Sequence, residues 1–109
     1  MTLMDEQGNI KYVARDTFDL HLVDIREDSV IVDFTNWDHK LKIFKQIGGQ
    51  PILVFEGTDI DKSIPGSLRF YKTPNDMQIS PGKYYYDWVV TRPNGKVETW
   101  INNKNFIVE

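Results

Sequence analysis

The sequence predicts an all-β fold, and two features of the residue pattern carry that prediction. Short runs of alternating apolar and polar residues recur about every ten residues, and each run ends in a turn. Glycine, proline and asparagine mark these turns, most clearly in the pair Asn94-Gly95. We expect about seven to eight antiparallel strands that form a β-sandwich, with at most one short helical turn.

The length and composition predict one small globular domain. The 109 residues suffice for a single core, so residues 1–9 are predicted to form a flexible arm and residues 10–109 one domain. Cysteine is absent, which excludes disulfides and cysteine-ligated metal. The net charge is −3 with scattered lysine and arginine, which argues against a nucleic-acid partner. No apolar run approaches the roughly 20 residues of a membrane span.

The first half of the chain predicts five strands. They are expected at residues 10–14, 17–23, 30–34, 41–47 and 52–55. In the second of these, Phe18, Leu20 and Leu22 share one face because side chains alternate along a strand. A polar turn is expected at residues 26–29, and Gly48-Gly49 supplies the loop between the last two strands.

The second half predicts a loop, a short strand, one helical turn and a terminal hairpin. The loop covers residues 57–66 and the short strand residues 67–71. Residues 73–79 are the one stretch with a helical signal, because Pro74 follows a possible cap at Thr73. The hairpin pairs residues 84–91 with 96–101, and a closing strand covers residues 105–108.

The register of the terminal hairpin predicts an interaction patch. With Asn94 and Gly95 as the two central turn residues, Val89 opposes Trp100 and Trp88 opposes Ile101. Tyr84, Tyr86, Trp88 and Val90 then face the core with Val97 and Ile101, while Tyr85, Asp87, Val89 and Thr91 face solvent with Glu98 and Trp100. Tyr85, Val89 and Trp100 therefore form a candidate patch for a partner. The alternative is a cross-strand pair that only stabilises the sheet.

No arrangement of reactive residues predicts catalysis, a metal or a cofactor. His21 and His39 lie far apart without a second ligand at metal-site spacing. The four serines, none of which has a nucleophile-elbow motif around it, are Ser29, Ser63, Ser67 and Ser80. We interpret all of these as structural or solvated side chains and predict that the protein is not an enzyme.

Two acidic clusters contain carboxylates that could bind calcium. Asp59 and Asp61 lie in one loop, and Asp24, Glu27 and Asp28 lie in another. Both lack the remaining oxygen ligands of a calcium loop, so solvated loop acids are the favoured interpretation. A glycosidase site, which needs two facing carboxylates, is a further alternative, but no feature of the sequence supports it.

Several segments in order resemble one family. RDTFDL at 15–20 is similar to "GDTF-x-L", and VDFTNW at 32–37 is similar to "IDLTGW/Y". LKIFK at 41–45 followed by GQPIL at 49–53 is similar to "x-Q-I-R-K … G-x-P-I-L". PGKYYYDW at 81–88 is similar to "PPG-x-Y-x-YDL", and NGKV at 94–97 with FIV at 106–108 is similar to "DG-x-V … G-x-F-x-V". Together these resemble the immunoglobulin-like modules of tailed-phage virion proteins, such as the N-terminal domain of baseplate upper proteins and related tail and head-decoration modules.

The resemblance covers residues 15–108 and implies a structural role. It implies an immunoglobulin-like β-sandwich in which Tyr84 or Tyr86 forms a tyrosine corner; the alternative is an aromatic that fills the core. Asn36 and Asn103 stand where the family has glycine, and residues 26–30 do not align. Asparagine enters the left-handed region comparatively easily, so the change at Asn103 is tolerable. The family's motif residues are structural, so no catalytic site is carried over.

The function predicted from these observations is a non-catalytic phage structural or adaptor protein. It would be a head-decoration, neck, tail or baseplate component, made in the host cytoplasm and carried in the virion. Its partners would be other virion proteins, in a homo-oligomer or in multiple symmetric copies. The alternative is a carbohydrate-binding or host-surface adhesion module in which Tyr85, Trp37 and Trp100 stack on sugars. A bacterial adhesin-like domain is disfavoured because the polar N-terminus does not predict an export signal.

Overall fold

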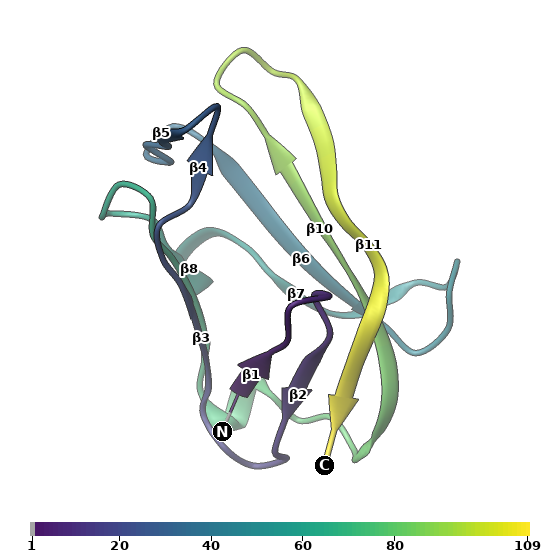
Figure 1. Cartoon of the computed structure of the whole chain (residues 1–109). Coiled ribbons are helices and arrows are strands. Elements are labelled where there is room, and N and C mark those ends of the chain that lie inside the picture. The colour runs from purple at the N-terminus through teal and green to yellow at the C-terminus, as the bar shows by residue number, and fades with distance from the viewer. Residues whose placement is uncertain (1) are drawn as a thin grey trace.

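Residues 2–109 are described by a computed structural model, and they form an all-β protein (Figure 1). The strands are β1 (Thr2–Met4), β2 (Ile10–Tyr12), β3 (Phe18–Leu22), β4 (Arg26–Glu27), β5 (Val30–Ile31), β6 (Asp38–Phe44), β7 (Pro51–Phe55), β8 (Ile60–Asp61), β9 (Leu68–Lys72), β10 (Gly82–Thr91) and β11 (Val97–Val108). Two single 3₁₀ turns, η1 (Gly57–Asp59) and η2 (Pro74–Asp76), are the helical elements of these residues. The predicted fold class, all-β, is confirmed.

The strands form three sheets rather than two. The largest has the order β1-β2-β11-β10-β6-β7, the second β3-β9-β8, and β4 and β5 form a separate hairpin. Neighbouring strands are antiparallel except β2 and β11, which run parallel. The strand count exceeds the prediction because β1, β4 and β8 were not predicted; they have only two or three residues, too few to show an alternating pattern.

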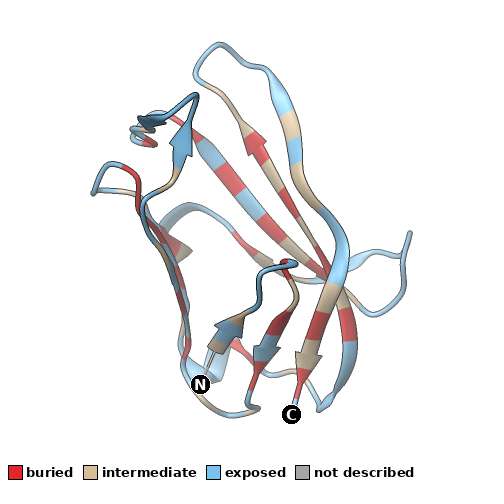
Figure 2. Ribbon diagram, viewed as in Figure 1, coloured by how far each residue is buried: buried red, intermediate tan, exposed pale blue. Residues whose placement is uncertain are grey.

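The core lies between the two larger sheets. Phe18 of β3 has its ring 4.6 Å from that of Phe55 in β7, and Phe70 of β9 lies 5.6 Å from Trp88 in β10. Figure 2 shows the buried positions alternating with more exposed ones along β6 and β10. The predicted alternation is confirmed here, since side chains two residues apart share a face of the sheet.

The N-terminal segment is ordered into the large sheet, contrary to the predicted flexible arm. β1 pairs with β2, with Thr2 opposite Tyr12. The turn between them is closed by Asp5, whose carboxylate accepts hydrogen bonds from the backbone N–H groups of Gln7 and Asn9, each at 2.9 Å. An aspartate that caps a tight turn in this way fixes the chain on both sides of it.

The segment from residue 26 to residue 34 also differs from prediction. Residues 26–29 were expected to be a turn before a strand at 30–34, but β4 and β5 pair with each other around Asp28 and Ser29. Those two residues have φ of 52° and 66°, the left-handed values of a tight hairpin turn. The tight turn therefore lies within the predicted one but is shorter, because Arg26 and Glu27 belong to β4, and the strand that follows ends at Ile31 instead of residue 34.

The β10–β11 hairpin has a longer loop than predicted, which shifts its register. The Arg92 N–H donates to the Lys96 carbonyl and the Gly95 N–H to the Arg92 carbonyl, so residues 93–95 form a three-residue loop with Gly95 at φ 89°. Val90 therefore faces Glu98, not Thr99.

An irregularity near Trp88 then restores the predicted pairing of Trp88 with Ile101. Trp100 falls in that irregularity and no longer opposes Val89, which pairs with Thr99. Val97 pairs with Thr91 and is 64% exposed, so its predicted core position is wrong. The longer loop is the cause, because a register shift of one residue turns each side chain to the opposite face.

Candidate protein-binding surface

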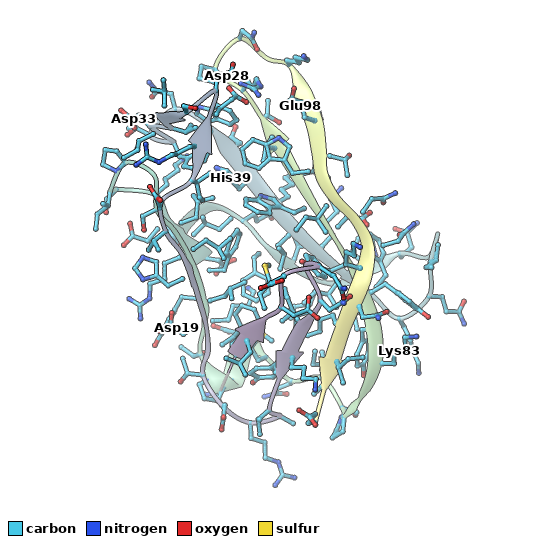
Figure 3. The ribbon with its side chains drawn as sticks, in the orientation of Figure 1. Asp19, Asp28, Asp33, His39, Lys83 and Glu98 are labelled. Carbon is cyan, nitrogen blue, oxygen red and sulfur yellow. The ribbon has the colours of Figure 1, made fainter. Side chains whose placement is uncertain are left out.

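Three loops lie together at one end of the molecule, and we call them the loop end. They are residues 23–37 between β3 and β6, residues 62–67 between β8 and β9, and residues 92–96 between β10 and β11 (Figure 1). Asp28 and Asp33 mark this end in Figure 3, above His39. Loops held on a rigid scaffold are where binding sites concentrate.

Gly66 joins two of these loops through its backbone. Its carbonyl accepts from the Ile25 N–H at 2.9 Å, and its N–H donates to the Val32 carbonyl at 2.7 Å. Gly66 has φ 73°, and a Cβ atom built on it would lie 2.8 Å from Cγ2 of Ile31. Glycine is needed here for both reasons, because other residues disfavour this φ and the space is already filled.

Arg92 joins the third loop to the β4–β5 hairpin. Its guanidinium binds both carboxylate oxygens of Glu27, one of them at 2.9 Å, and its Nε donates to Glu98 at 2.8 Å. The same guanidinium lies 4.6 Å from the ring centre of Trp37. These hydrogen bonds lower the pKa of Glu27 and of Glu98 below their ordinary value. A planar cation that pairs in this bidentate way fixes both orientation and distance.

An aromatic cluster lies directly under the loop end. Its five rings are Phe34, Trp37, His39, Trp88 and Trp100. Trp100 is 5.2 Å from Trp88 and 5.6 Å from Trp37, so it packs against the core and not on the solvent face. The cluster gives the loops a stiff base because tilted ring pairs pack closely.

His39 is the titratable group inside this cluster. It is 4% exposed, and its Nδ1 accepts a hydrogen bond from the Trp88 indole at 3.1 Å. Its Nε2 is buried and has no hydrogen-bond partner among the described residues. Burial, with the nearby charge of Lys62, lowers the pKa of His39 to about 4. At neutral pH the ring is therefore uncharged, with its proton on Nε2.

The loop end also exposes a group of aliphatic side chains. Val23 is 65%, Val30 66%, Ile31 45% and Ile64 62% exposed. They are four of the ten large apolar side chains that are exposed among residues 2–109. Exposed apolar side chains on loops that hydrogen bonds hold in place favour a contact with another macromolecule.

The structure separates the three residues of the patch predicted from sequence. Tyr85 and Val89 are half-buried on the outer face of the large sheet, opposite Phe44 and Lys40 in β6. Trp100 points to the inner face, where its Nε1 donates to Glu98 at 3.2 Å. The three do not share one face, because the three-residue loop shifts the register by one residue and so places Trp100 on the inner face.

The two tyrosines proposed for a corner both reach backbone carbonyls. The Tyr84 hydroxyl donates to the carbonyl of Ser80, four residues upstream, at 2.7 Å. The Tyr86 hydroxyl donates to the carbonyl of Gly8. Tyr84 makes the type of contact that defines a tyrosine corner, while Tyr86 ties the β1–β2 turn to the core.

One contact between reactive side chains was not predicted. His21 and Ser67 lie 46 residues apart in the chain, yet Nε2 and Oγ are 2.7 Å apart in a surface depression of about 460 Å³. The neighbouring carboxylates are engaged elsewhere, Asp19 by Arg69 at 2.8 and 2.7 Å and Asp61 by Ser63. Figure 3 places Asp19 on the side of β3 away from β10 and β11.

The hydrogen bonds of residues 2–109 place no carboxylate on the His21 ring, so the orienting member of a catalytic triad is not found there. The sequence did not indicate the contact between His21 and Ser67, because the two residues become neighbours only when β3 pairs with β9.

The acidic loops are engaged in local contacts. Asp59 pairs with Lys72 at 3.1 Å, and Asp24 pairs with Arg26 at 2.8 Å. Across residues 2–109 there is no group of three or more histidine, cysteine, aspartate or glutamate side chains that could hold a metal ion. The same residues contain no helix long and apolar enough to cross a membrane.

Comparison with protein-family models, with curated proteins and with solved structures finds no match to this chain.

Proposed function

We propose that this chain is a non-catalytic, immunoglobulin-like module that binds other proteins through its loop end. The strand order supports the fold: β3-β9-β8 and β11-β10-β6-β7 correspond to strands B-E-D and G-F-C-C′ of a variable-type immunoglobulin sandwich. In that correspondence residues 23–37 and 92–96 are the B–C and F–G loops, which carry the binding surface in variable domains.

The observation that carries the proposal is the exposed aliphatic group on cross-linked loops. Arg92 and Gly66 hold the loops before any partner arrives, so little ordering entropy is lost on binding. Val23, Val30, Ile31 and Ile64 supply apolar area, which contributes about 25 cal/mol per Å² removed from water. Rigid loops with exposed apolar side chains favour a protein partner of complementary shape.

We place the module in a phage virion, as a head-decoration, neck, tail or baseplate component present in multiple copies. The support is the ordered resemblance to virion modules, whose segments fall on β3, β6, β7, β10 and β11 and, for residues 32–37, on the loop before β6. A carbohydrate-binding function is less well supported, because Trp37 is 6% exposed beneath Arg92 and Trp100 packs against Trp88. Sugar rings need an open aromatic face.

The test is incorporation into particles of the phage whose genome carries the gene. We expect the protein in purified particles by mass spectrometry, and we expect Val30→Asp combined with Ile64→Asp to abolish incorporation on complementation. Val97→Asp is the matched control, because Val97 is 64% exposed but lies outside the aliphatic group. Absence from particles, or equal loss in both variants, would reject the proposal. Binding of wild type to a glycan array would favour the alternative.

A further inference from the structure

The edge strand β7 has one side free of hydrogen bonds to the described chain. It is the last strand of the large sheet, and it pairs with β6 alone, through Pro51, Leu53, Val54 and Phe55. No other backbone hydrogen bond to residues 51–55 occurs within residues 2–109. A strand edge of this kind presents N–H and C=O groups that a further strand can pair with.

The other edges of the two larger sheets are protected. β1 has three residues and lies against β3, where the Thr2 hydroxyl accepts from the Asp19 N–H. β3 is thereby covered and carries the charge of Asp19 on its outer face. β8 has two residues, one of them Asp61. Short length, charge and coverage are devices that prevent edge pairing, and so are proline and bulges. β7 carries Pro51 at its first position and a register irregularity with β6 at Ile52, but it has no charged residue and no covering segment among the described residues.

The composition of β7 is suited to pairing with itself. The sequence from Pro51 to Phe55 contains no charged residue, so two copies meet without like-charge repulsion. Ile52 is 47% exposed, and Ile47 in the preceding turn is 58% exposed. In an antiparallel arrangement centred on Leu53, Glu56 of one copy lies beside the 45–50 turn of the other, which carries the exposed charge of Lys45.

We propose that two copies of this chain pair through antiparallel β7 strands and join their large sheets into one. The arrangement is a two-fold isologous contact, in which Ile52 of each copy opposes Val54 of the other. β7 lies outside the loop end, so this pairing does not depend on the proposed partner surface.

A five-residue edge gives a small interface, and this sets the expected strength. Interfaces below about 1,000 Å² are weak or transient, so the dimer forms reversibly and in proportion to concentration. On a symmetric particle, neighbouring copies would be held close together, which raises the effective concentration of a weak contact.

The test uses opposite charges placed near the two-fold axis. Sedimentation velocity of wild type over a concentration series should show conversion to a species of twice the 12.8 kDa chain mass. Ile52→Lys and Ile52→Glu should each remain monomeric, because diagonal neighbours across the axis then carry like charges. An equimolar mixture of the two variants should regain the dimer. Val97→Lys, an exposed change away from the edge, should dimerise as wild type does.

Amide hydrogen exchange locates the contact independently. Backbone amides in residues 51–55 should become more protected as wild-type concentration rises, while those in the loop end should not change. A wild-type monomer at every concentration, or dimers in which Ile52→Lys and Ile52→Glu behave as wild type, would overturn the proposal. Dimers with protection confined to the loop end would overturn it as well.

Discussion

The core has two halves that are built differently. The half near the chain ends is lined by phenyl rings, namely Phe18, Phe55, Phe70 and Phe106, and the tyrosine hydroxyls there reach backbone carbonyls. The half under the loop end consists of Phe34, Trp37, His39, Trp88 and Trp100, and polar atoms lie within it. We call these the phenyl half and the indole half.

The difference teaches how each half is closed. The phenyl half lies where strands of both sheets face each other, so alternation alone fills it with apolar groups. The indole half extends beyond the smaller sheet and is covered by loops, in which backbone and side-chain polar groups must be satisfied. The contribution of the indole half to the free energy of unfolding therefore depends on pH and on loop geometry. The contribution of the phenyl half depends on packing.

The largest expected effect comes from the phenyl half. Phe18→Ala should lower the free energy of unfolding by about 3–5 kcal/mol, because it removes a fully buried ring that contacts both sheets. Chemical denaturation measures the change. Val23→Ala, just after the same strand and 65% exposed, should stay within about 0.5 kcal/mol of wild type. A loss below 1 kcal/mol for Phe18→Ala would contradict the described packing.

The next effect is a pH dependence confined to the indole half. Burial lowers the pKa of His39 from 6.5 to about 4, so the unfolded chain binds a proton in that interval and the folded protein does not. Stability is therefore full above pH 6.5 and falls as the pH decreases toward 4. Lys62 adds to the lowering and Asp38 opposes it. At 1.36 kcal/mol per pH unit, the loss is about 3 kcal/mol at most.

Denaturation midpoints measured across this interval check the assignment. His39→Gln should flatten the profile, because glutamine does not titrate. Phe18→Ala should keep the full slope while lying lower throughout, since its ring belongs to the other half. Equal slopes in wild type and His39→Gln would show that the histidine is not the group responsible.

The smallest effect separates backbone strain from crowding at the loop end. Gly66→Ala should cost about 1–3 kcal/mol, because φ 73° is strained for alanine and the new Cβ meets Ile31. Gly48→Ala is the matched control: φ is 81°, and no atom lies within 4 Å of the new Cβ. Gly48→Ala should therefore show only the cost of backbone strain, without the cost of crowding. Adding Ile31→Ala to Gly66→Ala should recover the difference between the two, and thermal unfolding would measure all three variants.

Much of the phenyl half could be predicted from sequence. The alternation of Phe18, Leu20 and Leu22 placed one face of β3 correctly, and Asn103 adopts φ 54°, the left-handed conformation that asparagine enters comparatively easily. These features are local, because they depend on residues a few positions apart.

The loop end could not be predicted in the same way. Arg92 and Glu27 are 65 residues apart, and their pairing exists only once the sheets are formed. Trp100 was misplaced because an asparagine–glycine pair supports both a two-residue and a three-residue loop, and a later bulge compensated for the difference. Long-range contacts and bulges leave no periodic signal in the chain.

The parallel pairing of β2 and β11 determines which end of the molecule stays free when the protein is attached through a terminus. The Glu109 N–H donates to the Tyr12 carbonyl and the Ala14 N–H to the Glu109 carbonyl, which fixes the C-terminus beside the first strands. β1 and the C-terminus lie in the lower part of Figure 1, opposite the loop end. A tag, bead or fused domain at either terminus would therefore lie away from Val30 and Ile64 and leave the loop end accessible.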